Sequence, residues 1–233
     1  MPASAAYPRF QRASDQSLLI YFDHLISLAA HEQLRRLLRL LELQPIFGIR
    51  NLHPAYCSLL IKFDPLATQH EHLESALRSY LQRLGDIDLP DALQVEIPVC
   101  YGGDFGPDLS DVAKQLGATT DRVIELHSSA TNLVYFHGFV PGFAYLGELP
   151  PALVIPRLAA PRRKVPAGSV GIAGNQTGVY PVSTPGGWRL LGRTPVQLFR
   201  SDRQQLSLLS IGDRVRFIPI SAERFAQLER GRP

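Results

Sequence analysis

Gly138-Phe139-Val140-Pro141-Gly142-Phe143-Ala144-Tyr145-Leu146-Gly147 opens the segment from which the fold of this chain is predicted. Residues 138–195 hold 10 of the 18 Gly and 9 of the 19 Pro residues of the chain. Gly permits backbone conformations that are closed to other residues, whereas Pro fixes φ and lacks an N–H donor. Short apolar runs separated by such turn residues are typical of a small β-barrel. The pattern fits a shaped binding surface, and it equally fits a compact β domain that binds no ligand.

Short strands are predicted on both sides of this segment and within it. They cover residues 93–100, 133–139, 169–173, 179–182, 188–191, 197–199 and 215–218. Helical spacing of apolar residues predicts one short helix that ends at Gly117 and a second that begins near Thr120. We therefore expect a β-barrel with two short helices inserted at its edge.

The first part of the chain alternates strand and helix patterns. Apolar runs at 17–22 and 56–63 predict strands, and each is followed by Leu residues at helical spacing, the second set ending at Gly85. The polar stretch 86–92 is the predicted linker. The expected fold class is α+β, with an N-terminal βαβα sandwich in residues 1–90, a β-barrel in residues 91–222 and a polar C-terminal tail in residues 223–233.

Composition excludes several classes of protein. The chain has 233 residues with a net charge of +3 and no polybasic run, so a nucleic-acid partner is not expected. No apolar run reaches the roughly 18 residues of a membrane span, and the first residues do not resemble a secretory signal. We expect a cytoplasmic protein with no membrane partner. Cys57 and Cys100 are predicted to be reduced core residues, because two distant cysteines make neither a metal motif nor a disulfide framework.

Familiar catalytic motifs are missing from the sequence. It has no phosphate-binding P-loop, no Gly-x-Gly-x-x-Gly fingerprint and no His-Glu-x-x-His pair. His70 and His72 would point to different sides of a helix, so no metal site is predicted. Ser169 lies in Ala167-Gly168-Ser169-Val170-Gly171, which departs from a nucleophile elbow, so we expect it to make a turn or ligand hydrogen bond.

Binding groups are concentrated between the Gly and Pro residues. Arg162, Arg163 and Lys164 precede a predicted turn, where they would either bind a carboxylate or phosphate or form a solvated basic turn. Further candidates are the neutral donors Gln176, Thr177 and Tyr180, the cation Arg193, the imidazole His137 and the aromatic Trp188. The imidazole is either a proton-transfer group or an ordinary edge residue, and the indole either stacks on a ligand or fills the barrel.

Four stretches carry a family resemblance. They are Ile97-Pro98-Val99-Cys100-Tyr101-Gly102-Gly103-Asp104-Phe105-Gly106-Pro107-Asp108-Leu109, the run 138–146, the run 165–181 and the run 185–195. Together they resemble the allophanate hydrolase subunit 1 family, over roughly residues 15 to 220. This family includes the B subunit of bacterial 5-oxoprolinase and a sporulation kinase inhibitor, and a related sequence forms half of the carboxyltransferase region of urea carboxylase. The resemblance implies that the barrel is cyclophilin-like.

The resemblance also implies a reaction and a set of site residues. Members of the 5-oxoprolinase branch convert 5-oxoproline to glutamate with ATP, accompanied by Mg²⁺, and act with companion subunits C and A, so this chain alone would be inactive. The implied catalytic residues are Lys164 and Arg193; His137 is added as a candidate proton-transfer group from its own position, where members of this family more often have an apolar residue. The implied substrate-binding residues are Pro141, Gly142, Arg163, Gly168, Ser169, Gln176, Thr177, Tyr180 and Trp188.

Two other functions fit the same resemblance. A regulatory protein that inhibits a sensor histidine kinase would use the same barrel, and so would a subunit related to urea carboxylase or allophanate hydrolase. The sequence does not separate these from a 5-oxoprolinase subunit, because all three share the fold.

Overall fold

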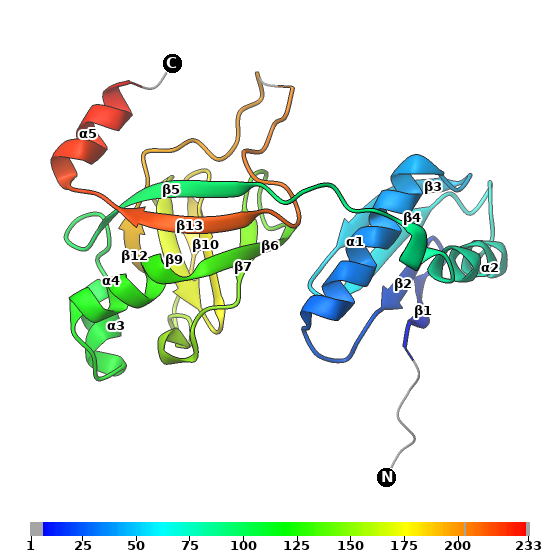
Figure 1. The fold of residues 1–233 in the computed structure, drawn as a ribbon, viewed down its shortest axis with the longest axis horizontal. Coiled ribbons are helices and arrows are strands. Elements are labelled where there is room, and N and C mark those ends of the chain that lie inside the picture. Colours follow the sequence, from blue (N-terminus) through cyan, green and yellow to red (C-terminus); the bar gives the residue numbers. More distant parts are fainter. Residues whose placement is uncertain (1–6, 203, 232–233) are drawn as a thin grey trace, which may run out of the picture. The chain divides into compact units, whose positions relative to one another are not determined.

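Residues 7–202 and 204–231 are described by a computed structural model of the chain. They form two compact units that divide between Asp91 and Ala92. Figure 1 shows the first unit as a sheet packed against helices and the second as a barrel with helices at its edges.

The first unit is a four-stranded antiparallel sheet covered by helices, with strand order β1-β2-β4-β3. Its elements are β1 (Arg9–Ser14), β2 (Ser17–Tyr21), α1 (Leu28–Leu43), β3 (Ile49–Pro54), β4 (Ser58–Phe63), α2 (His70–Leu81) and a 3₁₀ turn, η1 (Leu84–Asp86). Ser27 caps the N-terminus of α1, and its side chain accepts a hydrogen bond from the Ala30 N–H at 3.1 Å. Leu18 of β2, Leu37 of α1 and Leu77 of α2 are fully buried in one core.

Two strands of this sheet have no counterpart in the expected βαβα pattern. β1 and β3 lie at the two edges, and most of their side chains are exposed or only partly buried. A solvated edge strand needs no apolar run, and its polar residues reduce pairing with other chains. The unit is therefore ββαββα rather than βαβα, although its buried strands and both helices lie where the pattern placed them.

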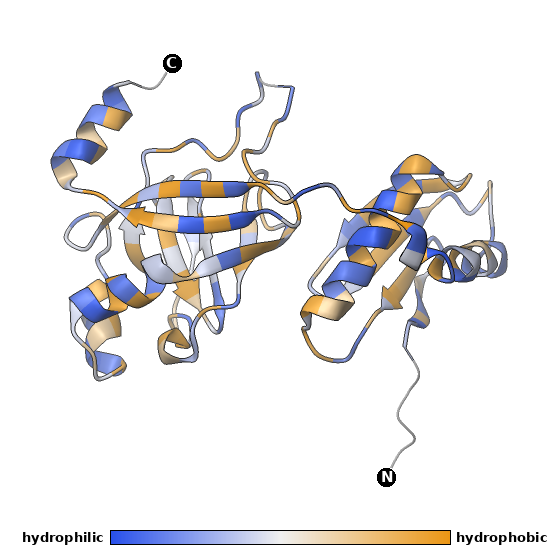
Figure 2. Cartoon of the chain, viewed as in Figure 1, coloured by the Kyte–Doolittle hydropathy of each residue, from blue (hydrophilic) through white to orange (hydrophobic). Residues whose placement is uncertain are grey.

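The second unit is built on a closed barrel of seven strands in the order β10-β7-β6-β13-β5-β12-β9. The barrel strands are β5 (Gln94–Tyr101), β6 (Thr131–His137), β7 (Ala144–Gly147), β9 (Ser169–Ala173), β10 (Gln176–Val179), β12 (Arg189–Arg193) and β13 (Arg214–Pro219). β5 and β13 pair in parallel, and the remaining pairs are antiparallel. Hydrophobic and hydrophilic residues alternate along β5 and β13 in Figure 2, as expected for strands with one face toward the core. The predicted α+β fold with a barrel is confirmed.

Other elements surround the barrel. They are α3 (Leu109–Gln115), α4 (Thr120–Ser129), the 3₁₀ turn η2 (Pro151–Leu153), the two-stranded sheet of β8 (Arg162–Val165) and β11 (Thr184–Gly186), and α5 (Ala222–Arg230). α3 and α4 are the two short helices that were predicted. Helix α5 occupies most of the stretch expected to be a polar tail. Its buried Phe225 packs against the ring of Phe105, with ring centroids 4.7 Å apart.

The barrel strands differ from their predicted positions at three places. β10 covers 176–179 rather than 179–182, because the polar start Gln176-Thr177-Gly178 resembles a turn. β7 was not predicted, since four residues next to a Pro-Gly turn give little periodicity. Residues 197–199 do not form a strand and carry only one bridge, between Phe199 and Ser207.

Among the described residues, no helix is both long enough and apolar enough to cross a bilayer. Cys57 and Cys100 are free thiols, the first half-buried and the second buried, and burial raises the pKa of both.

Leu77→Ala should lower the free energy of unfolding of the first unit by about 2–5 kcal/mol, because it leaves a cavity in a fully packed core. Urea unfolding followed by far-UV circular dichroism measures this loss. Leu66→Ala is the matched control: Leu66 is 97% exposed, so the same substitution there should change stability by less than about 0.5 kcal/mol. Equal effects of the two substitutions would contradict this core.

Candidate functional site

An aromatic hollow of about 300 Å³ lies in the second unit, beside the barrel. Its wall comes from the loop after β6, from β7, from the segment before β8, from the residue after β10, and from β11 with the two residues that follow it. The lining residues are Phe139, Phe143, Tyr145, Arg157, Pro161, Tyr180, Pro185, Gly186, Gly187 and Trp188. We call this cavity the aromatic hollow.

The rings of the aromatic hollow pack edge to face. Phe143 lies 5.4 Å from Tyr180 and 5.4 Å from Trp188 between ring centroids, and Tyr145 lies 5.9 Å from Trp188. These separations and tilted planes are the geometry that aromatic pairs prefer. The rings therefore support one another and form a stiff wall.

The turn after β6 places Phe139 at the rim. Phe139 has a φ of 68°, unusual for a residue with a side chain, and is 58% exposed. Gly142 has a φ of +82°, and a Cβ there would lie 2.5 Å from the Cβ of Phe199. Pro141 and Gly142 thus shape the turn that carries Phe139, and neither of them lines the hollow.

A close approach at Gly186 makes room for Tyr180. A Cβ at this glycine would lie 2.5 Å from the Tyr180 hydroxyl oxygen. Tyr180 is nearly fully buried, and its burial raises the pKa of the phenol, so the hydroxyl stays protonated at neutral pH.

A second hollow, of about 380 Å³, adjoins the first and shares three lining residues with it. It is lined by Tyr145, Arg157, Ala173, Gly174, Asn175, Gln176 and Trp188, and we call it the amide hollow. The shared wall consists of Tyr145, Arg157 and Trp188. Aromatic, amide and guanidinium groups are the kinds of group that line small-molecule sites, and the two hollows together offer apolar faces, amide hydrogen-bonding groups and one positive charge.

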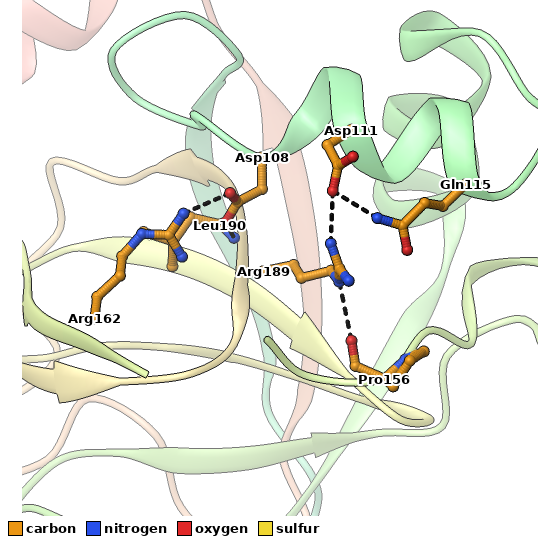
Figure 3. A network of polar contacts seen from close by, with 7 residues as sticks. All are labelled: Asp108, Asp111, Gln115, Pro156, Arg162, Arg189 and Leu190. Carbon is orange, nitrogen blue, oxygen red and sulfur yellow. Dashed lines mark hydrogen bonds and ion pairs between the residues drawn. The ribbon is translucent and has the colours of Figure 1, made fainter. Parts of the chain in front are cut away.

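An ion-pair network holds the segments that form these hollows (Figure 3). One carboxylate oxygen of Asp108 accepts from Arg162 of β8 at 2.5 Å, and the other accepts from the Leu190 N–H of β12 at 2.7 Å. Asp108 is itself buried at the start of α3. It therefore ties the helix, the outer sheet and the barrel together at one point.

Arg189 makes the second half of the network. Its Nη1 donates to Asp111 at 2.7 Å, and its Nε donates to the Pro156 carbonyl at 2.9 Å. Gln115 donates to the same Asp111 oxygen at 2.7 Å (Figure 3). Because Pro156 precedes Arg157 and Arg189 follows Trp188, this network fixes the backbone beside two residues of the shared wall.

The cations predicted from the sequence lie elsewhere. Arg163 and Lys164 are exposed on β8, and Arg162 is engaged by Asp108. Arg193 donates its Nε to the Ala167 carbonyl at 2.9 Å and lies over the ring of Phe225, 5.9 Å from its centroid. None of the four lines either hollow.

The turn residues Gly168 and Ser169 are buried in the barrel wall rather than exposed beside the cations. Gly168 has a φ of +83°, and its N–H donates to the Tyr180 carbonyl at 2.7 Å. The Ser169 carbonyl accepts from the Tyr180 N–H at 2.9 Å. The two residues therefore support Tyr180 through the backbone.

Thr177 lies in a buried hydrogen-bond chain that sequence reasoning missed. Its hydroxyl donates to the Gly171 carbonyl at 3.1 Å, so it accepts from Nε2 of His127 at 2.9 Å. Nδ1 of His127 then accepts from the Tyr101 hydroxyl at 2.7 Å. The Thr177 hydroxyl is fully buried and engaged by these two bonds, and it lines neither hollow.

His127 is fully buried in this chain, and the loss of water lowers its pKa to about 3. Its ring stacks on Phe217 of β13, with centroids 4.6 Å apart. In the sequence, His127 follows Ile124 and Leu126 in an ordinary amphipathic helix, so nothing there indicates that its imidazole is buried against the barrel. The imidazole fastens α4 to three barrel strands, β5, β10 and β13.

His137 ends β6 and is half-buried. Its Nδ1 is buried without a hydrogen-bond partner among the described residues, and burial lowers its pKa. It does not line either hollow. Of the predicted site residues, Tyr180 and Trp188 line the aromatic hollow and Gln176 and Trp188 line the amide hollow, whereas Arg157, Phe143 and Tyr145 were not predicted.

A family profile described as carboxyltransferase domain, subdomain C and D, matches residues 8–209. The chain belongs to this family. The resemblance seen in the sequence motifs is thereby confirmed, and with it the shared fold.

Three known proteins are similar to this chain. The B subunit of 5-oxoprolinase from Bacillus subtilis (strain 168) is 40% identical over 228 residues, which cover 93% of this chain and 95% of that protein. The B subunit of 5-oxoprolinase from Escherichia coli O157:H7 is 56% identical over 130 residues, covering 56% and 60% of the two chains. The crystal structure of TTHA0988 matches with a TM-score of 0.78 at 37% identity and covers 90% of this chain. This chain spans 41% of TTHA0988.

Gly186→Ala should lower the free energy of unfolding of this carboxyltransferase-domain barrel by about 1–3 kcal/mol, because the new methyl group overlaps Tyr180. Trp188, the single tryptophan of the chain, reports this transition in a urea titration followed by fluorescence. Gly187→Ala is the matched control, since its Cβ would meet no atom closer than 3.6 Å. A loss at Gly187 as large as that at Gly186 would contradict the close approach.

His127 should make the barrel less stable as the pH falls below about 6.5. Its folded pKa of about 3 lies below its usual 6.5, so between these values the unfolded chain binds a proton that the native chain does not. Between pH 6 and pH 5, the wild type should lose about 1 kcal/mol more unfolding free energy than His127→Gln. Urea titrations of both chains at the two pH values measure this difference, and identical pH slopes would refute the buried neutral imidazole.

Proposed function

We propose that this chain is the B subunit of an ATP-dependent 5-oxoprolinase, which hydrolyses the lactam of 5-oxoproline to glutamate. In this proposal it acts in the cytoplasm together with companion subunits C and A, and it is inactive without them. The observation that carries the proposal is the match to the Bacillus subtilis 5-oxoprolinase protein, which extends over nearly the full length of both chains.

The chemistry of the two hollows supports this proposal. The substrate is a flat five-membered lactam with one carboxylate, and it offers an apolar ring, an amide and a negative charge. The aromatic hollow, the amide hollow and the guanidinium of Arg157 complement these three features in turn. A subunit that binds and orients the lactam would contribute to catalysis by positioning the carbonyl for groups supplied elsewhere in the complex.

The described residues gather no metal site made of protein ligands alone. No group of three or more His, Cys, Asp or Glu side chains is gathered among them in a way that could hold a metal ion. We therefore assign no step of the reaction to ATP or Mg²⁺ on this chain. Arg163 and Lys164 are exposed and remain proposed contacts for an anionic group, whereas the bonds of Arg193 favour a structural role.

The proposal is tested by measuring glutamate release from 5-oxoproline with this chain co-purified with subunits C and A. Glutamate should form only when ATP is present, and it should fall to the background rate when this chain is left out. The control is the complex incubated with ATP but without 5-oxoproline.

An intact complex that releases no glutamate would refute the proposal. The same preparation should then be tested for inhibition of a sensor histidine kinase and for turnover of urea-derived substrates, because those functions share the fold.

A further inference from the structure

We propose that Arg157 binds the carboxylate of 5-oxoproline while the lactam ring lies in the aromatic hollow. This inference rests on the proposed function, because it takes the substrate class from there. It assigns the binding of the substrate carboxylate to Arg157, which neither the family motifs nor the predicted basic turn at residues 162–164 indicated.

The guanidinium of Arg157 is available to a ligand. The residue is exposed, and its side chain makes no hydrogen bond or ion pair with any residue that the structure describes. Its neighbours along the chain differ in this respect, since Arg162 is bound by Asp108. Arg189, whose Nε donates to the Pro156 carbonyl next to Arg157, is bound by Asp111. Arg157 is thus the charged group left open beside the hollows.

The backbone around Arg157 is fixed on both sides. The Pro156 carbonyl accepts from Arg189 at 2.9 Å, and the Leu158 N–H donates to the Gly187 carbonyl at 2.8 Å. Holding the main chain in this way leaves only the side chain to be ordered when a ligand binds, which reduces the entropic cost of binding.

The charge of Arg157 stands alone in its surroundings. Among the described residues that line the two hollows, it is the one charged side chain. A guanidinium can form two parallel hydrogen bonds with a carboxylate, and such charge-assisted pairs are stronger than neutral hydrogen bonds. A ligand with one carboxylate therefore satisfies the site, and no acidic lining residue competes for the cation.

The rest of the ligand is matched by the walls on each side of Arg157. Trp188 and Tyr145 belong to both hollows, so a ring held against them lies beside the guanidinium. The half-buried amides of Asn175 and Gln176 lie on the far side of this shared wall, and they offer the donors and acceptors that a lactam N–H and C=O require.

Trp188 makes the proposal testable on the full chain without its companions. It is the single tryptophan, and it lines both hollows, so its fluorescence should change saturably as 5-oxoproline is added. Arg157→Gln should weaken this binding at least tenfold, and Arg157→Lys should recover part of it, because the charge remains but the paired geometry does not. Arg224→Gln, at an exposed arginine of α5 outside both hollows, is the matched control and should bind like the wild type.

A second ligand separates the carboxylate from the ring. 2-Pyrrolidinone has the lactam ring without the carboxylate, so it should bind wild type and Arg157→Gln with the same affinity. Each of three results would overturn the proposal: no saturable binding of 5-oxoproline by fluorescence and calorimetry, equal losses in Arg157→Gln and Arg224→Gln, or a response to ATP that Arg157→Gln abolishes while 5-oxoproline gives none.

Steady-state kinetics distinguish failure of this site from failure of the proposed function. In the complex with subunits C and A, Arg157→Gln should raise KM for 5-oxoproline at least tenfold. Glutamate release with an unchanged KM would reject the site and leave the proposed function standing. Binding of 5-oxoproline that depends on Arg157, in a complex that never releases glutamate, would support the site and reject the function.

Discussion

The two oxygens of the Asp108 carboxylate join parts of the second unit that lie far apart in sequence. One holds Arg162 in the outer sheet, and the other holds the Leu190 N–H in the barrel. A buried carboxylate is stable only when such partners satisfy it, so the start of α3, β8 and β12 must adopt one mutual arrangement. Arg189 and Asp111 extend this arrangement to the segment that carries Arg157. The geometry of both hollows follows from these contacts.

The hollows differ in character from the core that supports them. The barrel interior is filled by apolar side chains such as Val99, Leu146 and Phe217, and Tyr101 and Thr177 are paired with His127 at its edge. Outside the barrel, aromatic rings stand edge to face and leave space between them. A stiff interior and a stiff wall keep that space open, as the proposed binding of a small rigid molecule requires.

Much of the fold was predictable because it depends on local patterns. Leu residues at helical spacing identified α1 and α2, and turn residues between short apolar runs identified a barrel. The edge strands β1 and β3 were not predicted, because a solvated strand carries little hydrophobic periodicity. The candidate site was less predictable, since it depends on which side chains are already engaged. Sequence alone shows Arg157, Arg162 and Arg189 as three similar cations, and only the positions of Asp108 and Asp111 show that two of them are engaged in ion pairs.

The pairing of β5 has a consequence for the order in which the chain folds during synthesis. β5 ends at Tyr101, yet its two neighbours are β12, which begins at Arg189, and β13, which ends at Pro219. The first unit has all of its strands by Phe63 and its last long helix by Leu81, so it is complete soon after it leaves the ribosome. β5 cannot complete its pairing until β13 has been synthesised, more than a hundred residues later. Until β12 emerges, neither edge of β5 can pair with its barrel neighbours. The nascent chain therefore passes through a long period in which a folded first unit precedes an open, aggregation-prone strand.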